Sequence, residues 1–83
     1  MKLCYLISYD LCQPDKSYDS LYDTIRRFPK WARLTDSFWA VISTATASDI
    51  RDYLLRFIDE NDRIIVIRSG RIAAWNNIIA SNE

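Results

Sequence analysis

The chain has no histidine, one glycine, two prolines and two cysteines among its 83 residues. Without histidine, Ser–His and Cys–His nucleophilic pairs and a histidine general base are excluded. Two cysteines without histidine cannot build a four-ligand zinc site of the usual kind. Any catalysis must therefore depend on carboxylates, a metal that they bind, hydroxyl groups, or arginine and lysine.

Long apolar runs are also missing from the chain. No stretch approaches the roughly 20 residues of a membrane span, and the first residues lack the pattern of a secretory signal peptide. We therefore expect a cytoplasmic protein. Scarce glycine and proline, with 49% hydrophobic residues, are typical of a compact chain rather than a disordered one. The length predicts one small domain over residues 1–83.

Neither sign of charge dominates, because 11 Lys and Arg balance 11 Asp and Glu. This balance argues against nonspecific nucleic-acid binding by a broadly basic surface. One segment nevertheless interleaves cations with an aromatic ring that could stack on a base. Its candidate nucleic-acid-binding residues are Arg26, Arg27, Lys30, Trp31 and Arg33. The alternative is a solvated helix end, with Trp31 in the core or an interface.

The first apolar stretch, Leu3 to Asp10, predicts a strand buried on both faces and therefore central in a sheet. Asp10 lies where this strand gives way to a loop. A carboxylate there is well placed for site chemistry, but it can equally end a strand by accepting backbone hydrogen bonds. A second acidic group, Asp59, Glu60 and Asp62, lacks the spacing and the glycine of a calcium loop, which is therefore rejected.

Apolar residues at helical spacing predict a helix from Tyr18 to Phe28, stopped by Pro29. A second helix is predicted to carry Ile50 to Ile58, after a cap at Thr46. Extended segments are predicted at 32–35, 37–43, 63–68 and 72–75.

This order of elements predicts an α+β, ferredoxin-like βαββαβ fold with a short extra C-terminal strand. Right-handed connections put both helices on one face of an antiparallel sheet, with the first and third strands central. The opposite face is then bare, and three Trp and five Tyr exceed the needs of one small core. We therefore expect a homodimer, joined through its sheets or its last strand. The candidate interface residues are Trp39, Trp75, Ile78 and Ile79.

Three features together resemble a known group of proteins: the Tyr9-Asp10 strand end, this order of elements, and the sequence Ser37-Phe38-Trp39. The group is the superfamily of the small CRISPR-associated protein Cas-Two and the VapD-type toxin ribonucleases. The resemblance implies a ferredoxin-like homodimer in which strand-end aspartates of two subunits face each other. There they are proposed to bind a divalent metal that activates water against a phosphodiester.

On this resemblance, Asp10 is the catalytic and metal-binding residue, and Ser37 is a catalytic residue that supports it. A symmetric pair of carboxylates, with waters and a substrate phosphate, could hold Mg²⁺ or Mn²⁺ where one carboxylate could not. The function expected is a metal-dependent endonuclease that acts on RNA or DNA. The chain departs from the pattern at Thr35 and Asp36, where the CRISPR proteins commonly carry Gln and Arg.

The alternative is a noncatalytic dimeric scaffold, or a module that binds nucleic acid or protein in a CRISPR, phage-defence or toxin–antitoxin system. The neutral charge and the missing arginine at position 36 favour this alternative, whereas the Tyr-Asp strand end favours the nuclease. A small-ligand sensor at the dimer cleft is a third class, supported only by the surplus of aromatic residues.

Overall fold

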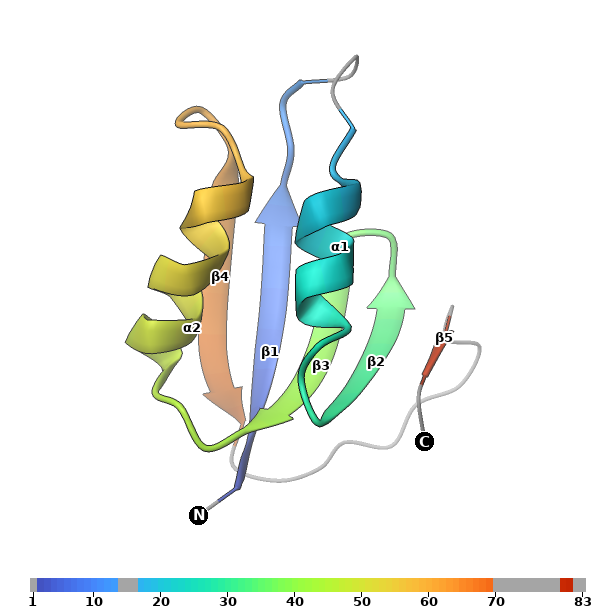
Figure 1. Cartoon of the computed structure of the whole chain (residues 1–83), viewed down its shortest axis with the longest axis vertical. Coiled ribbons are helices and arrows are strands. Elements are labelled where there is room, and N and C mark those ends of the chain that lie inside the picture. The colour runs from blue at the N-terminus through green and yellow to red at the C-terminus, as the bar shows by residue number, and fades with distance from the viewer. Residues whose placement is uncertain (1, 14–16, 70–79, 82–83) are drawn as a thin grey trace.

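The computed structural model describes residues 2–13, 17–69 and 80–81, which form a small α+β fold. Two helices cover one face of an antiparallel sheet (Figure 1). The strands are β1 (Leu3–Asp10), β2 (Lys30–Thr35), β3 (Phe38–Ser43), β4 (Arg63–Ser69) and β5 (Ala80–Ser81). The helices are α1 (Asp19–Ile25) and α2 (Ala47–Leu54), and a 3₁₀ turn, Leu55–Phe57, continues α2.

The strand order is β4-β1-β3-β2-β5, which puts β1 and β3 in the interior of the sheet. β1 pairs with β3 from Leu3 opposite Ser43 to Ser8 opposite Phe38, and it pairs with β4 along its other side. All neighbouring pairs among the described strands are antiparallel. This arrangement is consistent with a ferredoxin-like fold.

The two faces of β1 differ in burial. Tyr5, Ile7 and Tyr9 are buried against the helices, whereas Leu6 and Ser8 are only half-buried. Successive residues of a strand point to opposite faces, so β1 has one closed and one partly open face. This corrects the prediction of a strand buried on both faces. The sequence does not show this difference, because Leu6 is as apolar as Ile7. When both faces of a strand carry apolar residues, the alternation of apolar and polar residues is lost.

The core lies between the sheet and the helices, around Trp39 of β3. The Trp39 side chain is 0% exposed, and its indole Nε1 donates a hydrogen bond of 2.9 Å to the Tyr9 phenol oxygen. This burial corrects the expectation that Trp39 lies at a dimer interface, because one copy already encloses the side chain. The helices contribute Leu21, Ile25, Ile50 and Leu54 to the same core.

α1 is shorter than its apolar spacing predicts. The amides of Arg27 and Phe28 donate to carbonyls three residues back, those of Thr24 and Ile25, at 3.1 and 3.2 Å. These bonds make a tight turn instead of another turn of α-helix. Pro29 contributes to the early end, because proline disfavours the helical conformation in the residue before it.

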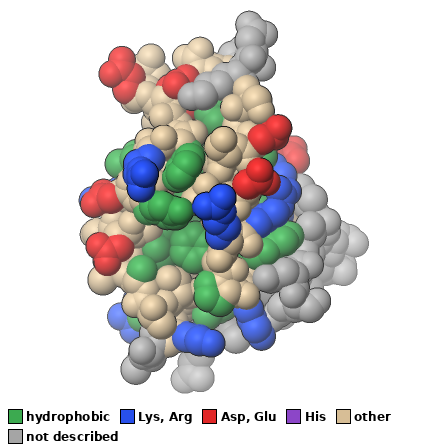
Figure 2. All heavy atoms as spheres, viewed as in Figure 1, with side chains coloured by type: hydrophobic (Ala, Val, Ile, Leu, Met, Phe, Trp, Pro, Cys, Tyr) green, Lys and Arg blue, Asp and Glu red, His purple; other side chains and the backbone are tan. Residues whose placement is uncertain are grey.

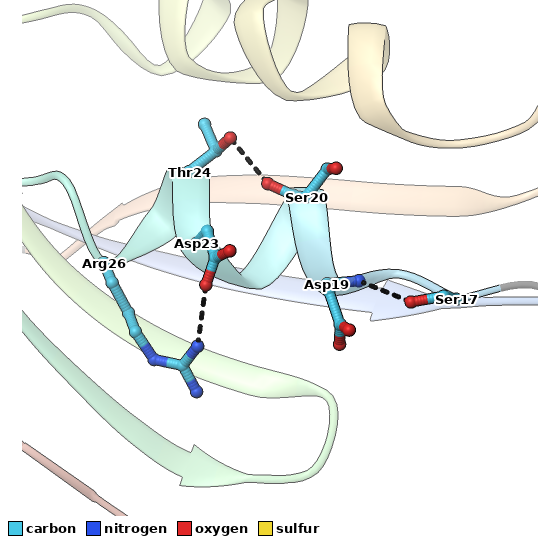
Figure 3. A network of polar contacts seen from close by, with 6 residues as sticks. All are labelled: Ser17, Asp19, Ser20, Asp23, Thr24 and Arg26. Atoms are coloured by element: carbon cyan, nitrogen blue, oxygen red, sulfur yellow. Dashed lines mark hydrogen bonds and ion pairs between the residues drawn. The ribbon is translucent and has the colours of Figure 1, made fainter.

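Figure 3 shows three polar contacts along α1 and its entry. Ser17 Oγ accepts a hydrogen bond from the first amide of the helix at 3.4 Å. The buried Thr24 hydroxyl donates to the Ser20 carbonyl, one turn back, at 2.6 Å, so it is satisfied inside the fold. On the exposed side, Arg26 pairs with Asp23 at 3.3 Å.

α2 begins after the predicted cap. The Thr46 hydroxyl accepts a hydrogen bond from the Asp49 amide at 3.1 Å, which satisfies one of the free amides of the first turn. None of the described helices is long and apolar enough to cross a membrane. The strand predicted at 72–75 lies outside the described residues, as do Trp75, Ile78 and Ile79.

Leu54 and Leu55 provide a matched test of the core, because they are adjacent leucines with 0% and 46% exposure. Leu54→Ala should lower the free energy of unfolding by about 2–5 kcal/mol, since it leaves a cavity among packed side chains. Leu55→Ala should lower it by less than about 1 kcal/mol. Urea unfolding followed by circular dichroism measures both, and equal losses would contradict this packing.

Candidate functional site

Asp10 ends β1 on the sheet face that the helices leave uncovered. Tyr9 faces the helices, so by strand alternation Asp10 lies on the opposite face with Leu6 and Ser8. One Asp10 carboxylate oxygen lies 3.7 Å from a guanidinium nitrogen of Arg63, the residue opposite it on β4. The two side chains are 68% and 83% exposed, so this ion pair is weak. Asp10 is thus an accessible carboxylate beside one cation.

Ser37 lies next to this strand end, in the turn between β2 and β3. Its carbonyl accepts a hydrogen bond from the Tyr9 amide at 3.1 Å, which attaches the turn to β1 one residue before Asp10. The Asp36 carbonyl of the same turn accepts from Tyr9 Oη at 2.7 Å and from Arg33 Nη2 at 2.9 Å. The structure therefore brings Asp10 and Ser37 to one end of the sheet, where both side chains are exposed.

One copy of the chain does not complete a metal site within residues 2–13, 17–69 and 80–81. No group of three His, Cys, Asp or Glu side chains gathers there. Asp10 alone offers two carboxylate oxygens, fewer than Mg²⁺ or Mn²⁺ takes. The hard oxygens and the exposure of Asp10 fit a shared site that a second copy, water and phosphate would complete. Arg63 opposes this fit, because its guanidinium competes with a metal for the same carboxylate.

The predicted nucleic-acid-binding residues do not form one surface. Arg26, Trp31 and Arg33 come together with Tyr22 and Trp39 on the helix side, and we call this group the arginine–aromatic cluster. The Arg26 guanidinium carbon lies 5.7 Å from the centroid of the Trp31 ring. That of Arg33 lies 4.5 Å from the Tyr22 ring and 5.0 Å from the Trp39 ring. At these distances the cations interact favourably with the ring faces.

Part of the arginine–aromatic cluster packs against the hydrophobic core. Trp31 is half-buried, and its ring centroid lies 5.6 Å from that of Trp39. Arg33 is half-buried too, and its Nε is buried without a hydrogen-bond partner among the described residues. Packing therefore occupies Trp31 and Arg33, as the alternative interpretation of Trp31 expects. Arg26 is the more accessible cation of the cluster.

Arg27 and Lys30 lie elsewhere. Arg27 lines a cavity of about 320 Å³ between α1 and α2, together with Phe28, Ile50 and Tyr53. Figure 2 looks onto this helix side and shows hydrophobic side chains between charged ones near its middle. Lys30 and Trp31 are neighbours on β2, so their side chains point to opposite faces of the sheet. Five residues close in sequence therefore serve three separate surfaces.

Asp62 is the residue that sequence reasoning missed. It is 9% exposed, and its carboxylate accepts hydrogen bonds from the Cys12 amide at 2.7 Å and from the Tyr18 hydroxyl and the Asp59 amide, both at 2.8 Å. In the sequence it is one of three acidic residues in a polar turn, and their spacing does not separate a buried carboxylate from a solvated one. The one available signal is its place directly before a strongly apolar strand.

The described residues thus present three features: the exposed Asp10 with Ser37, the arginine–aromatic cluster, and the buried Asp62. No protein-family model matches the sequence, and no solved structure matches the chain. The interpretation of these features therefore depends on their own geometry and chemistry.

Burial, together with the hydrogen bond to Asp62, raises the pKa of Tyr18 to about 12. The pKa of a tyrosine in an unfolded chain is about 10. Between this pH and about pH 12, the folded chain therefore keeps a proton that the unfolded chain loses. The stability that Tyr18 contributes should be complete below about pH 10 and should fall as the pH rises toward about 12. Tyr18→Phe should remove this part of the alkaline loss of stability.

Chemical denaturation from pH 9 to pH 12 measures the effect of Tyr18, and the exposed Tyr53 supplies the control. Tyr53→Phe should not reproduce the effect of Tyr18→Phe, because the hydrogen bond to Asp62 comes from Tyr18. An unaltered alkaline slope in Tyr18→Phe would show that the Tyr18–Asp62 hydrogen bond does not contribute as described.

Proposed function

We propose that the chain is a ferredoxin-like, homodimeric, metal-dependent endonuclease of the Cas-Two/VapD kind, acting in the cytoplasm. The position of Asp10 carries this proposal: it is an exposed carboxylate at the end of a central strand, on the open face of the sheet. Two copies that cover each other through this face would have their Asp10 side chains on facing surfaces. The strand order β4-β1-β3-β2 supports the ferredoxin-like part of the proposal.

Apolar side chains on the open face support a homodimer. Ile65 and Ile67 of β4 are 55% and 51% exposed, and they lie opposite Ser8 and Leu6 of β1. Exposed apolar side chains gathered on one sheet face favour association, because burial removes them from water. A second copy of the chain offers the same apolar strip and can cover it symmetrically.

The chemistry follows from the groups at this end of the sheet. Asp10 of each copy would hold Mg²⁺ or Mn²⁺, which supplies Lewis-acid activation of a phosphodiester and of water. The exposed Ser37 hydroxyl would hydrogen-bond a phosphate oxygen. Arg26 and Arg27 would attract the nucleic-acid backbone from the helix side, with a strong dependence on salt. RNA and DNA are both candidate substrates.

Asp10→Asn tests the nuclease directly, because it removes the charge that holds the metal while keeping the side-chain shape. Cleavage of labelled single-stranded RNA and duplex DNA with Mg²⁺ or Mn²⁺ should fall about 100-fold or more, as expected when a catalytic carboxylate is lost. EDTA should stop the wild-type reaction. Asp52→Asn is the control, since Asp52 is an exposed helix residue that pairs with Arg51. Cutting that survives Asp10→Asn would refute this role.

A noncatalytic dimeric scaffold is the second candidate, and the Asp10–Arg63 ion pair favours it. The Asp10 carboxylate already has a guanidinium beside it that competes with a metal, and Asp36 stands where the resembled CRISPR proteins carry arginine. In that case Asp10→Asn alters only a weak surface pair, and partner binding continues. Charge reversal at Arg26 and Arg27 would instead weaken the interaction with a partner.

The homodimer has its own test, which applies to both candidates. Ile67→Glu puts a charge on the open face and should weaken dimerisation at least about tenfold, which corresponds to about 1.4 kcal/mol. Leu55→Glu is the matched control, because Leu55 is exposed after α2, outside the sheet. Sedimentation across a concentration series measures both variants. A wild-type chain that stays monomeric at high micromolar concentration would contradict the dimer.

A further inference from the structure

Asp62 joins three segments that meet beside the Asp10 strand end. Its carboxylate accepts from the Cys12 amide after β1, from the Tyr18 hydroxyl before α1, and from the Asp59 amide in the turn before β4. A buried carboxylate is stable only when such donors satisfy it, and loss of the acceptor would leave the donors unpaired. These three contacts therefore depend on one side chain.

Asp10 and Arg63 are both close in sequence to a residue of this hydrogen-bond network. Cys12 follows Asp10 by two residues, and Arg63 directly follows Asp62. Among the described residues, Asp10 and Arg63 are the last pair of the ladder between β1 and β4. Figure 1 shows the end of β1 and the start of β4 at the same end of the sheet.

A second hydrogen bond joins the loop after β1 to the turn before β4. The Cys12 thiol donates to the Asn61 carbonyl at 3.3 Å, next to the bond between the Cys12 amide and Asp62. The loop after β1 and the turn before β4 are therefore connected at two adjacent points.

We infer that Asp62 is a positioning residue for Asp10: it locks the loop that follows β1 to the turn that precedes β4, and so fixes the direction in which the Asp10 carboxylate projects. Its catalytic meaning rests on the proposed nuclease. The locking of the two segments does not depend on that activity and can be measured without it.

Asp62→Asn tests the inference, since an amide keeps the shape but loses charge and turns one acceptor into a donor. Glu60→Gln is the matched control, because Glu60 is an exposed acid in the same turn. Amide hydrogen exchange of Cys12 and Asp59 should become at least about tenfold faster in Asp62→Asn, while that of Ile7 in the middle of β1 stays unchanged. Unchanged exchange at Cys12, or equal acceleration at all amides, would overturn the inference.

Binding of Mn²⁺, measured by isothermal titration calorimetry, tests the catalytic meaning. Asp62→Asn should weaken binding by about 10–100-fold, the usual effect of removing a group that orients a metal ligand, whereas Glu60→Gln should not. Faster exchange at Cys12 with unaltered Mn²⁺ affinity would overturn the link from Asp62 to Asp10. A wild-type chain that binds no Mn²⁺ would overturn the nuclease instead, and the exchange result would then decide the positioning role alone.

Discussion

The buried hydrogen bond from the Trp39 indole to the Tyr9 phenol is the interaction on which the site end of the sheet depends. A buried indole N–H needs an acceptor, and Tyr9 supplies it while donating its own proton to the Asp36 carbonyl. Burial raises the pKa of Tyr9, which keeps the phenol protonated and able to donate. Because this bond holds Tyr9 toward the helices, the pleat of β1 turns the next residue, Asp10, to the open face.

The elements of the fold could largely be predicted from sequence, because the apolar spacing in α1 and α2 reflects the buried faces of these helices. The apolar run of β4 also marks a strand, although Ile65 and Ile67 are exposed. The residues at which the elements end could not be predicted as well, because α1 ends in a tight turn before Pro29. The composition gives the number of aromatic residues but not their positions in the fold. It therefore suggests an interface for Trp39, whose side chain in fact fills the core. The position of Asp10 at a strand end could be predicted, because the apolar run stops there. The role of Asp62 could not be predicted, because two of its three donors, the Cys12 amide and the Tyr18 hydroxyl, come from distant segments.

The basic segment shows why neighbours in sequence do not make a surface. A helix end separates Arg26 from Arg27 around its axis, and a strand sends Lys30 and Trp31 to opposite faces. A turn between these elements adds a further change of direction. The residues that do lie together form the arginine–aromatic cluster, in which the arginines contact the faces of aromatic rings. Any electrostatic attraction of nucleic acid would therefore arise from several scattered cations rather than from one basic patch.

The place of β4 in the sheet has a consequence for self-association. Among the described strands it pairs with β1 alone, so it forms an edge of the sheet and carries exposed isoleucines. Such edges can template fibres by adding strand after strand. Arg63 and Arg68 lie near the two ends of β4, opposite Asp10 and Tyr5 of β1, so their side chains point to opposite faces of the sheet. Charged side chains on both faces of an edge strand disfavour the addition of a further strand, which protects against open-ended polymers.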